Sequence, residues 1–74
     1  MTPLVDVYED ELYYYVFFPS SDVDCLLMSP WGNLYGWEQK NNPRVWRNYL
    51  GTKVNFENCP ILVKEAIKEE WSKQ

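Results

Sequence analysis

Histidine is absent from this chain of 74 residues. Its absence removes the most common general acid–base side chain, the nucleophilic triads that use an imidazole, and the most common metal ligand. The glycines Gly32, Gly36 and Gly51 are scattered, and none opens a predicted helix, so the sequence contains no phosphate-binding loop. We therefore expect a protein that is not an enzyme and has no catalytic site.

Metal ligands are also scarce. The two cysteines, Cys25 and Cys59, are too far apart in the sequence to form the close pairs of a zinc site. The acids Asp22 and Asp24, even when taken with residues 9–11, lack the ligand order and the central glycine of a calcium-binding loop. We expect neither a metal nor a cofactor.

Features of secreted and membrane proteins are missing. Small secreted domains normally carry about four or more cysteines. The N-terminus, MTPLVDVYEDE, has acids where a secretion signal has a basic segment and an apolar run. The longest apolar run is far shorter than the roughly 20 residues that span a bilayer. We expect a cytoplasmic protein that does not enter a membrane and keeps its thiols reduced.

Cys59 directly precedes Pro60 at a predicted helix start. A helix dipole at this position can lower the pKa of a thiol and make it reactive. We prefer the other interpretation, in which Cys59 is a small buried hydrophobic residue.

Basic residues are absent from residues 1–39, which hold seven acids, whereas residues 40–74 hold seven bases and four acids. The isoelectric point of about 4.6 is opposite to the basic footprint of nucleic-acid-binding proteins, so we expect no direct nucleic-acid binding. The uneven charge indicates either an acidic surface for a partner or acids and bases that pair within the fold. The sequence leaves both alternatives open.

Size limits the core of this protein. The chain is long enough for a single domain, residues 1–74, and it buries only about 60% of the surface that its unfolded form exposes. Aromatic residues make up 18% of the chain, and each buried ring removes roughly 150–250 Å² from water. A second copy of the chain is another way to complete a small core, so a homo-oligomer stays an alternative.

The first half of the chain predicts two hairpins. Residues 4–8 and 12–18 form the first, although its turn, residues 9–11, lacks the usual Asn-Gly or Asp-Gly. Residues 22–29 and 34–38 form the second, with alternate side chains on opposite faces. The segment LYYYVFF is too uniformly apolar for a strand with one solvated face, so we expect it at the centre of the sheet.

The second half predicts a helix over 43–50, a strand over 52–56 and an amphipathic helix over 61–72. Asn42 and Asn58, each followed by an early proline, are the expected N-caps. Glu69 and Lys73 have the spacing of a favourable i, i+4 pair. The last helix has an apolar stripe made of Leu62, Val63, Ala66, Ile67 and Trp71.

These elements occur in the order β-β-β-β-α-β-α. The order predicts a small α+β fold, with a mostly antiparallel sheet of four to five strands. The short helix and the C-terminal amphipathic helix are expected to pack on one face of the sheet.

Residues 29–37 read SPWGNLYGW and place aromatic side chains around a predicted turn. Gly36, inside the return strand, indicates a bulge or a close approach by another chain or ligand. Either Tyr35 or Trp37 is expected to point inward. Trp31 lies at the tip of the turn, where it either folds back over the sheet or is presented to a partner, since tryptophan is enriched among interface hot spots.

The sequence therefore predicts a non-enzymatic protein–protein interaction module or regulatory accessory protein that docks onto a basic protein surface. One alternative is an acidic inhibitor that mimics nucleic acid on a basic partner. The other is a self-associating structural protein whose seam is the strand over 13–18, if that strand lies at an edge. The candidate partner-binding residues are Trp31, Asp22, Asp24, Glu9, Asp10 and Glu11.

Overall fold

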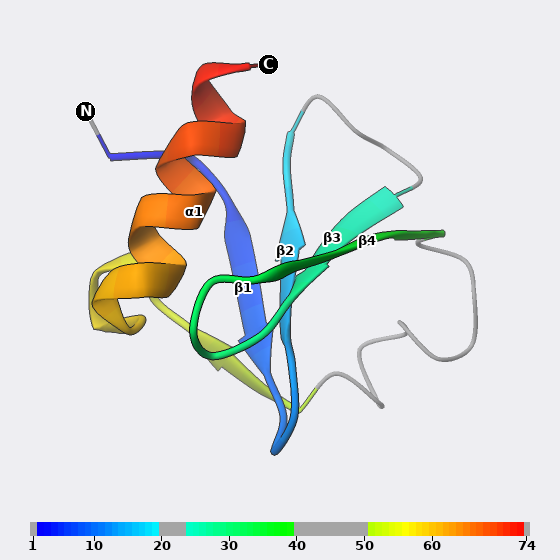
Figure 1. Ribbon diagram of the computed structural model, residues 1–74. Coiled ribbons are helices and arrows are strands. Elements are labelled where there is room, and N and C mark those ends of the chain that lie inside the picture. The colour runs from blue at the N-terminus through cyan, green and yellow to red at the C-terminus, as the bar shows by residue number, and fades with distance from the viewer. Residues whose placement is uncertain (1, 20–23, 40–50, 74) are drawn as a thin grey trace.

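The computed structural model describes residues 2–19, 24–39 and 51–73. A 3-10 helix, Phe56–Asn58, and the helix α1, Ile61–Ser72, follow the strands (Figure 1). The predicted α+β class is confirmed, whereas the helix predicted over 43–50 lies outside the described residues. The strands are β1 (Asp6–Glu9), β2 (Tyr14–Phe17), β3 (Asp24–Met28), β4 (Leu34–Gln39) and β5 (Thr52–Val54).

The strands form one open antiparallel sheet in the order β4-β3-β2-β1-β5. Both predicted hairpins are confirmed, and the observed strand ends differ from the predicted ones by at most two residues. The segment predicted to be central is β2, the middle strand. Because β2 is flanked by β1 and β3, it cannot be the exposed seam of a self-associating form.

Two predictions around the last helix are wrong. Phe56 was expected to end a strand, but it begins the 3-10 helix, because the Cys59 N–H donates to the Phe56 carbonyl and the ring is buried in the core. Asn58 was expected to cap the helix that follows. The observed N-cap is Pro60, which supplies no side-chain hydrogen bond, while the Asn58 N–H donates to the carbonyl of Asn55 within the 3-10 turn.

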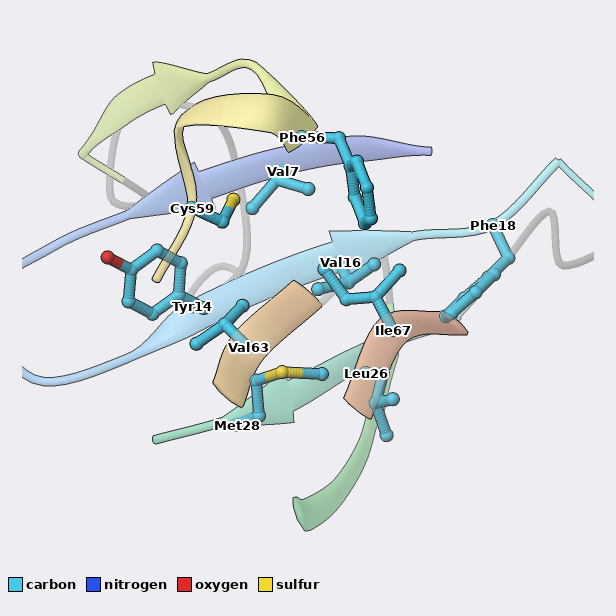
Figure 2. Close-up of a cluster of buried hydrophobic side chains, with 10 residues drawn as sticks. All are labelled: Val7, Tyr14, Val16, Phe18, Leu26, Met28, Phe56, Cys59, Val63 and Ile67. Atoms are coloured by element: carbon cyan, nitrogen blue, oxygen red, sulfur yellow. The ribbon is translucent and has the colours of Figure 1, made fainter. Parts of the chain in front are cut away.

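Helix α1 covers one face of the sheet, and the main core lies between them (Figure 2). Phe18, just after β2, stacks on Trp71 with 6.4 Å between ring centroids. Val63 and Ile67 are fully buried against the strands. The buried members of this core are Val7, Tyr14, Val16, Phe18, Leu26, Met28, Phe56, Cys59, Val63 and Ile67.

Leu62 does not belong to the buried stripe of α1, contrary to prediction, and its side chain is 52% exposed. Residues that repeat every four positions, Val63, Ile67 and Trp71, face the sheet. Successive helical residues are rotated by about 100°, so Leu62 is turned from Val63 onto the flank of the helix.

The opposite face of the sheet carries a second cluster, which we call the tyrosine face. Its rings meet edge to face, with 5.5 Å between the centroids of Tyr13 and Tyr35 and 5.8 Å between those of Tyr8 and Phe17. Such edge-to-face pairs are worth roughly 0.5–1.5 kcal/mol beyond the area that they bury. The tyrosine face comprises Tyr8, Tyr13, Tyr15, Phe17, Cys25, Leu27 and Tyr35.

The two cysteines lie on opposite faces of the sheet. Cys25 belongs to the tyrosine face and Cys59 to the core beneath α1, and neither forms a disulfide. Cys59 is 5% exposed, which confirms that it is a small buried hydrophobic residue. Burial, followed by the nearby charge of Glu9, raises the pKa of its thiol, which is opposite to the lowered pKa that a reactive thiol at the helix start requires. No helix among the described residues is long and apolar enough to cross a bilayer.

Candidate partner-binding surface

The turn between β3 and β4, residues 29–33, is compact and built on Ser29. The buried Ser29 hydroxyl accepts hydrogen bonds from the N–H groups of Trp31 and Asn33, at 3.2 and 3.0 Å. The Gly32 N–H donates to the Ser29 carbonyl at 3.0 Å, and Gly32 has φ of 83°. This arrangement, a β-turn followed by a left-handed glycine, is a common way to close a hairpin, and it confirms the predicted turn.

Trp31 sits at the tip of this turn with 70% of its surface exposed. Of the two alternatives for this residue, the structure therefore excludes the ring folded back over the sheet. The hydrogen bonds of Ser29 hold the backbone on both sides of Trp31. An indole on a fixed backbone loses less conformational freedom when it binds than one on a mobile loop.

Gly32 lies against the first turn of α1. A Cβ atom at this position would be 2.5 Å from the Leu62 carbonyl oxygen and 3.5 Å from the Leu62 Cβ. The turn and the start of the helix, far apart in sequence, are therefore side by side (Figure 1). Trp31 is the residue before this contact, so its backbone lies one residue from the approach to the exposed Leu62.

Four exposed hydrophobic residues belong to the two segments that meet here, the β3–β4 turn with the start of β4 and the first turn of α1, and we call them the Trp31 patch: Trp31, Leu34, Ile61 and Leu62. Leu34 pairs with Met28, whose side chain belongs to the core beneath α1, and cross-strand partners share a face of the sheet. Leu34 therefore faces the same side as the helix. Several exposed apolar side chains on adjoining segments are typical of an interaction surface.

Asp10, one of the predicted binding residues, is engaged in closing the first hairpin. Its Oδ1 accepts the N–H groups of Leu12 and Tyr13, both at 2.7 Å, and its Oδ2 accepts the Tyr15 hydroxyl at 2.6 Å. Partial burial raises the pKa of Asp10, but these hydrogen bonds outweigh it and hold the pKa below its ordinary value. The side chain of Asp10 thus replaces the missing Asn-Gly signal.

The carboxylate of Glu9 accepts a hydrogen bond from Tyr14, which lies on the face of the sheet that α1 covers. Burial, followed by a hydrogen bond to Glu9, raises the pKa of Tyr14 well above its ordinary value, as burial and Asp10 do for Tyr15. Two consecutive carboxylates therefore hold two consecutive phenols, one on each side of the sheet. Both acids have a structural role, whatever else they bind.

The remaining predicted acids are dispersed. Glu11 is exposed at the β1–β2 turn, which lies at the same end of the antiparallel sheet as the β3–β4 turn. Asp24 begins β3, at the opposite end of that strand from Trp31 and roughly 13 Å away from its last residue at about 3.3 Å per residue. Asp22 and the side chain of Asp24 lie outside the described part of the chain. Glu11 therefore lies at the same end of the sheet as Trp31, whereas Asp24 begins its strand at the opposite end.

The acidic and basic halves of the sequence meet in the sheet. Strand β5, from the second half, pairs with β1, and the Lys53 Nζ lies 3.4 Å from Asp6 Oδ1. At this edge the charges pair within the fold, which was one of the two alternatives. Among residues 2–19, 24–39 and 51–73, no group of three or more cysteines and acids is arranged to hold a metal ion.

Three members of the Trp31 patch were not predicted as binding residues, namely Leu34, Ile61 and Leu62. Leu62 was predicted to be buried. The rotation of about 100° between Leu62 and Val63 is the signal that could have placed it on the flank of the helix instead. Nothing local in the sequence indicated that the turn at Gly32 would meet the start of α1. Compared with known protein families, curated proteins and solved structures, the chain gives no match.

Proposed function

We propose that this protein is a small, non-enzymatic, cytoplasmic interaction module that docks onto a partner protein through the Trp31 patch. The observation that supports the proposal best is Trp31 itself, 70% exposed on a turn that Ser29 fixes from within. A few residues supply most of the energy of a typical interface, and tryptophan is prominent among them. The partner offers an apolar pocket within a basic surface.

The chemistry of the described nucleophilic and acidic groups favours a binding role over catalysis. The Cys59 thiol is buried with a raised pKa, so little of it is in the reactive thiolate form at neutral pH. The phenols of Tyr14 and Tyr15 are tied to Glu9 and Asp10. These groups stabilise the fold instead of meeting in an open cleft.

Mimicry of nucleic acid has less support. A mimic presents free carboxylates where phosphates would lie, but Asp6 pairs with Lys53 and both oxygens of Asp10 accept hydrogen bonds. Among the N-terminal acids whose side chains the structure describes, Asp6, Glu9 and Asp10 are engaged within the fold.

Self-association through the sheet edges also has less support. Strand β4 is bulged, since its register against β3 shifts between Leu27 and Met28, and bulges discourage edge pairing. Gly36 lies at this bulge, which was one of the two alternatives for it, and a Cβ atom there would meet nothing within 4 Å. Strand β5, at the other edge, has three residues and the exposed Lys53, which are further protective features.

The test is capture of partners by immobilised protein from a lysate of the source organism, with Trp31→Ala and Leu12→Ala compared with wild type. Leu12 is 66% exposed at the β1–β2 turn, outside the Trp31 patch, and serves as the matched control. We expect Trp31→Ala to lose a protein that wild type and Leu12→Ala both retain. Retention of the same proteins by all three forms, each shown to be folded by circular dichroism, would refute the proposal.

A further inference from the structure

The exposed surface of α1 has two sides of opposite charge. Leu62, Glu65 and Glu69 are spaced at i, i+3 and i+7, which places them along one side of the helix. The same spacing repeats one residue earlier and places Ile61, Lys64 and Lys68 along the other side. Each side therefore starts with an apolar residue of the Trp31 patch and continues with charges of one sign.

The contact at Gly32 decides which side adjoins the β3–β4 turn. Gly32 approaches the backbone and Cβ of Leu62, the first residue of the acidic side. The turn that carries Trp31 therefore adjoins the side that continues with Glu65 and Glu69. The basic side, with Lys64 and Lys68, lies farther around the helix.

The carboxylates of Glu65 and Glu69 form no ion pair with any residue in the described part of the chain. Lys73, which was expected to pair with Glu69, instead places its Nζ 3.3 Å from Glu70 Oε1. The i, i+4 prediction for Glu69 and Lys73 is therefore wrong. Two unpaired carboxylates, four residues or about 6 Å of helix apart, continue directly from the apolar patch.

We infer that the Trp31 patch and the carboxylates of Glu65 and Glu69 form one docking surface whose occupant is a cationic amphipathic segment of a partner protein. An apolar side chain of that segment seats beside Trp31 and Leu62. Lysine or arginine side chains, one helical turn apart, face Glu65 and Glu69. Charge complementarity selects this occupant, since an anionic segment would meet two like charges.

This inference rests on the proposed function and makes it more specific. It assigns the electrostatic part of recognition to α1 and not to the N-terminal acids. Lys64 and Lys68 orient the partner, because a cationic segment displaced toward them is repelled.

The test uses the full chain, labelled with ¹⁵N, and a synthetic cationic amphipathic helix of about four turns with leucines on one face and flanking lysines. One control peptide carries glutamate in place of every lysine, and the other carries serine in place of every leucine. We expect the cationic peptide alone to bind, with amide shifts centred on Trp31, Leu62, Glu65 and Glu69. We expect the double variant Glu65→Gln/Glu69→Gln to weaken binding about tenfold at low salt, since each exposed pair contributes modestly.

Two further variants separate the possible outcomes. Glu57→Gln removes an exposed acid outside the surface and leaves the affinity unchanged. Loss of affinity in Glu11→Gln, without loss in the Glu65→Gln/Glu69→Gln double variant, would place recognition at the β1–β2 turn and overturn the inference alone. A peptide affinity that falls in Trp31→Ala but not in the Glu65→Gln/Glu69→Gln double variant would likewise overturn the inference and leave the proposed function standing.

Other results contradict the inference more broadly. Equal binding of the anionic peptide, or no binding of the cationic one at millimolar concentration, overturns it. Sedimentation velocity of the unliganded chain tests whether a second copy of the chain occupies this surface. A dimer that dissociates in the Trp31→Ala variant would show that it does, and would overturn the inference. If Trp31→Ala changes neither peptide binding nor partner capture, the proposed function fails as well.

Discussion

The Tyr15 hydroxyl donates a hydrogen bond of 2.6 Å to the Asp10 carboxylate, and this contact ties the centre of the sheet to the turn that precedes it. The other oxygen of the same carboxylate accepts both N–H groups of the turn. One acid therefore closes the hairpin and satisfies a phenol on a ring that is 7% exposed. Asp10 and its neighbour Glu9, two acids of the N-terminal half, therefore stabilise the fold through their hydrogen bonds to tyrosine hydroxyls.

Removal of this carboxylate is expected to destabilise the protein. Asp10→Ala leaves a buried phenol and two turn N–H groups without their acceptor, and we expect a loss of about 1–3 kcal/mol in the free energy of unfolding. Tyr15→Phe removes a single hydrogen bond and should cost about 0.5–1.5 kcal/mol. Urea unfolding of both single variants and of the double variant measures their coupling. Losses that simply add would show that the two groups do not interact.

The same carboxylate gives the protein a pH dependence. Its pKa in the folded state is below the ordinary value of 3.8, so the stability that it contributes is present above that value and is lost as the pH falls through the lower, folded pKa. We expect the difference in unfolding free energy between wild type and Asp10→Asn to be constant from about pH 7 to 5 and to narrow in more acidic solution. A difference that widens on acidification would mean that the pKa is raised.

Alanine variants of Gly51 and Gly36 distinguish the cost of a steric clash from the cost of backbone strain. Both have positive φ, 84° and 131°, but a Cβ at Gly51 would strike the carbonyl of Glu9, whereas a Cβ at Gly36 would meet nothing within 4 Å. Each alanine variant should lose roughly 1–3 kcal/mol from strain. Gly51→Ala should lose more, because the backbone of the first hairpin must also move. Thermal unfolding of the two variants measures the difference, and equal losses would contradict the close approach.

Truncation of a buried and of an exposed aliphatic residue of α1 should change stability and binding in opposite ways. Ile67 is fully buried, so Ile67→Ala should cost about 2–5 kcal/mol of unfolding free energy. Leu62 is half exposed, and Leu62→Ala should cost less than about 1 kcal/mol while weakening partner binding. Guanidinium unfolding, run beside the peptide titration, measures both. A large loss of unfolding free energy in Leu62→Ala would show that Leu62 packs in the core and contradict its exposed position.

Most local elements followed from local signals. The segment LYYYVFF predicted a central strand because it leaves no face for water, and β2 is the middle strand. Pro30 and Gly32 predicted the β3–β4 turn because their backbone preferences fit it, and the spacing of Val63, Ile67 and Trp71 predicted the buried side of α1. These features depend on interactions between residues that are close in sequence.

Tertiary structure decided the rest, because the groups involved are far apart in the chain. Nothing near Lys53 indicates that β5 pairs with β1, nor does the sequence around Gly32 show that its turn lies against Leu62. The sequence by itself determined which residues form the hairpins and the helix, and that Trp31 occupies a turn. Whether Trp31 is exposed, and which charges lie beside it, depended on where the helix docks, which long-range packing alone determines.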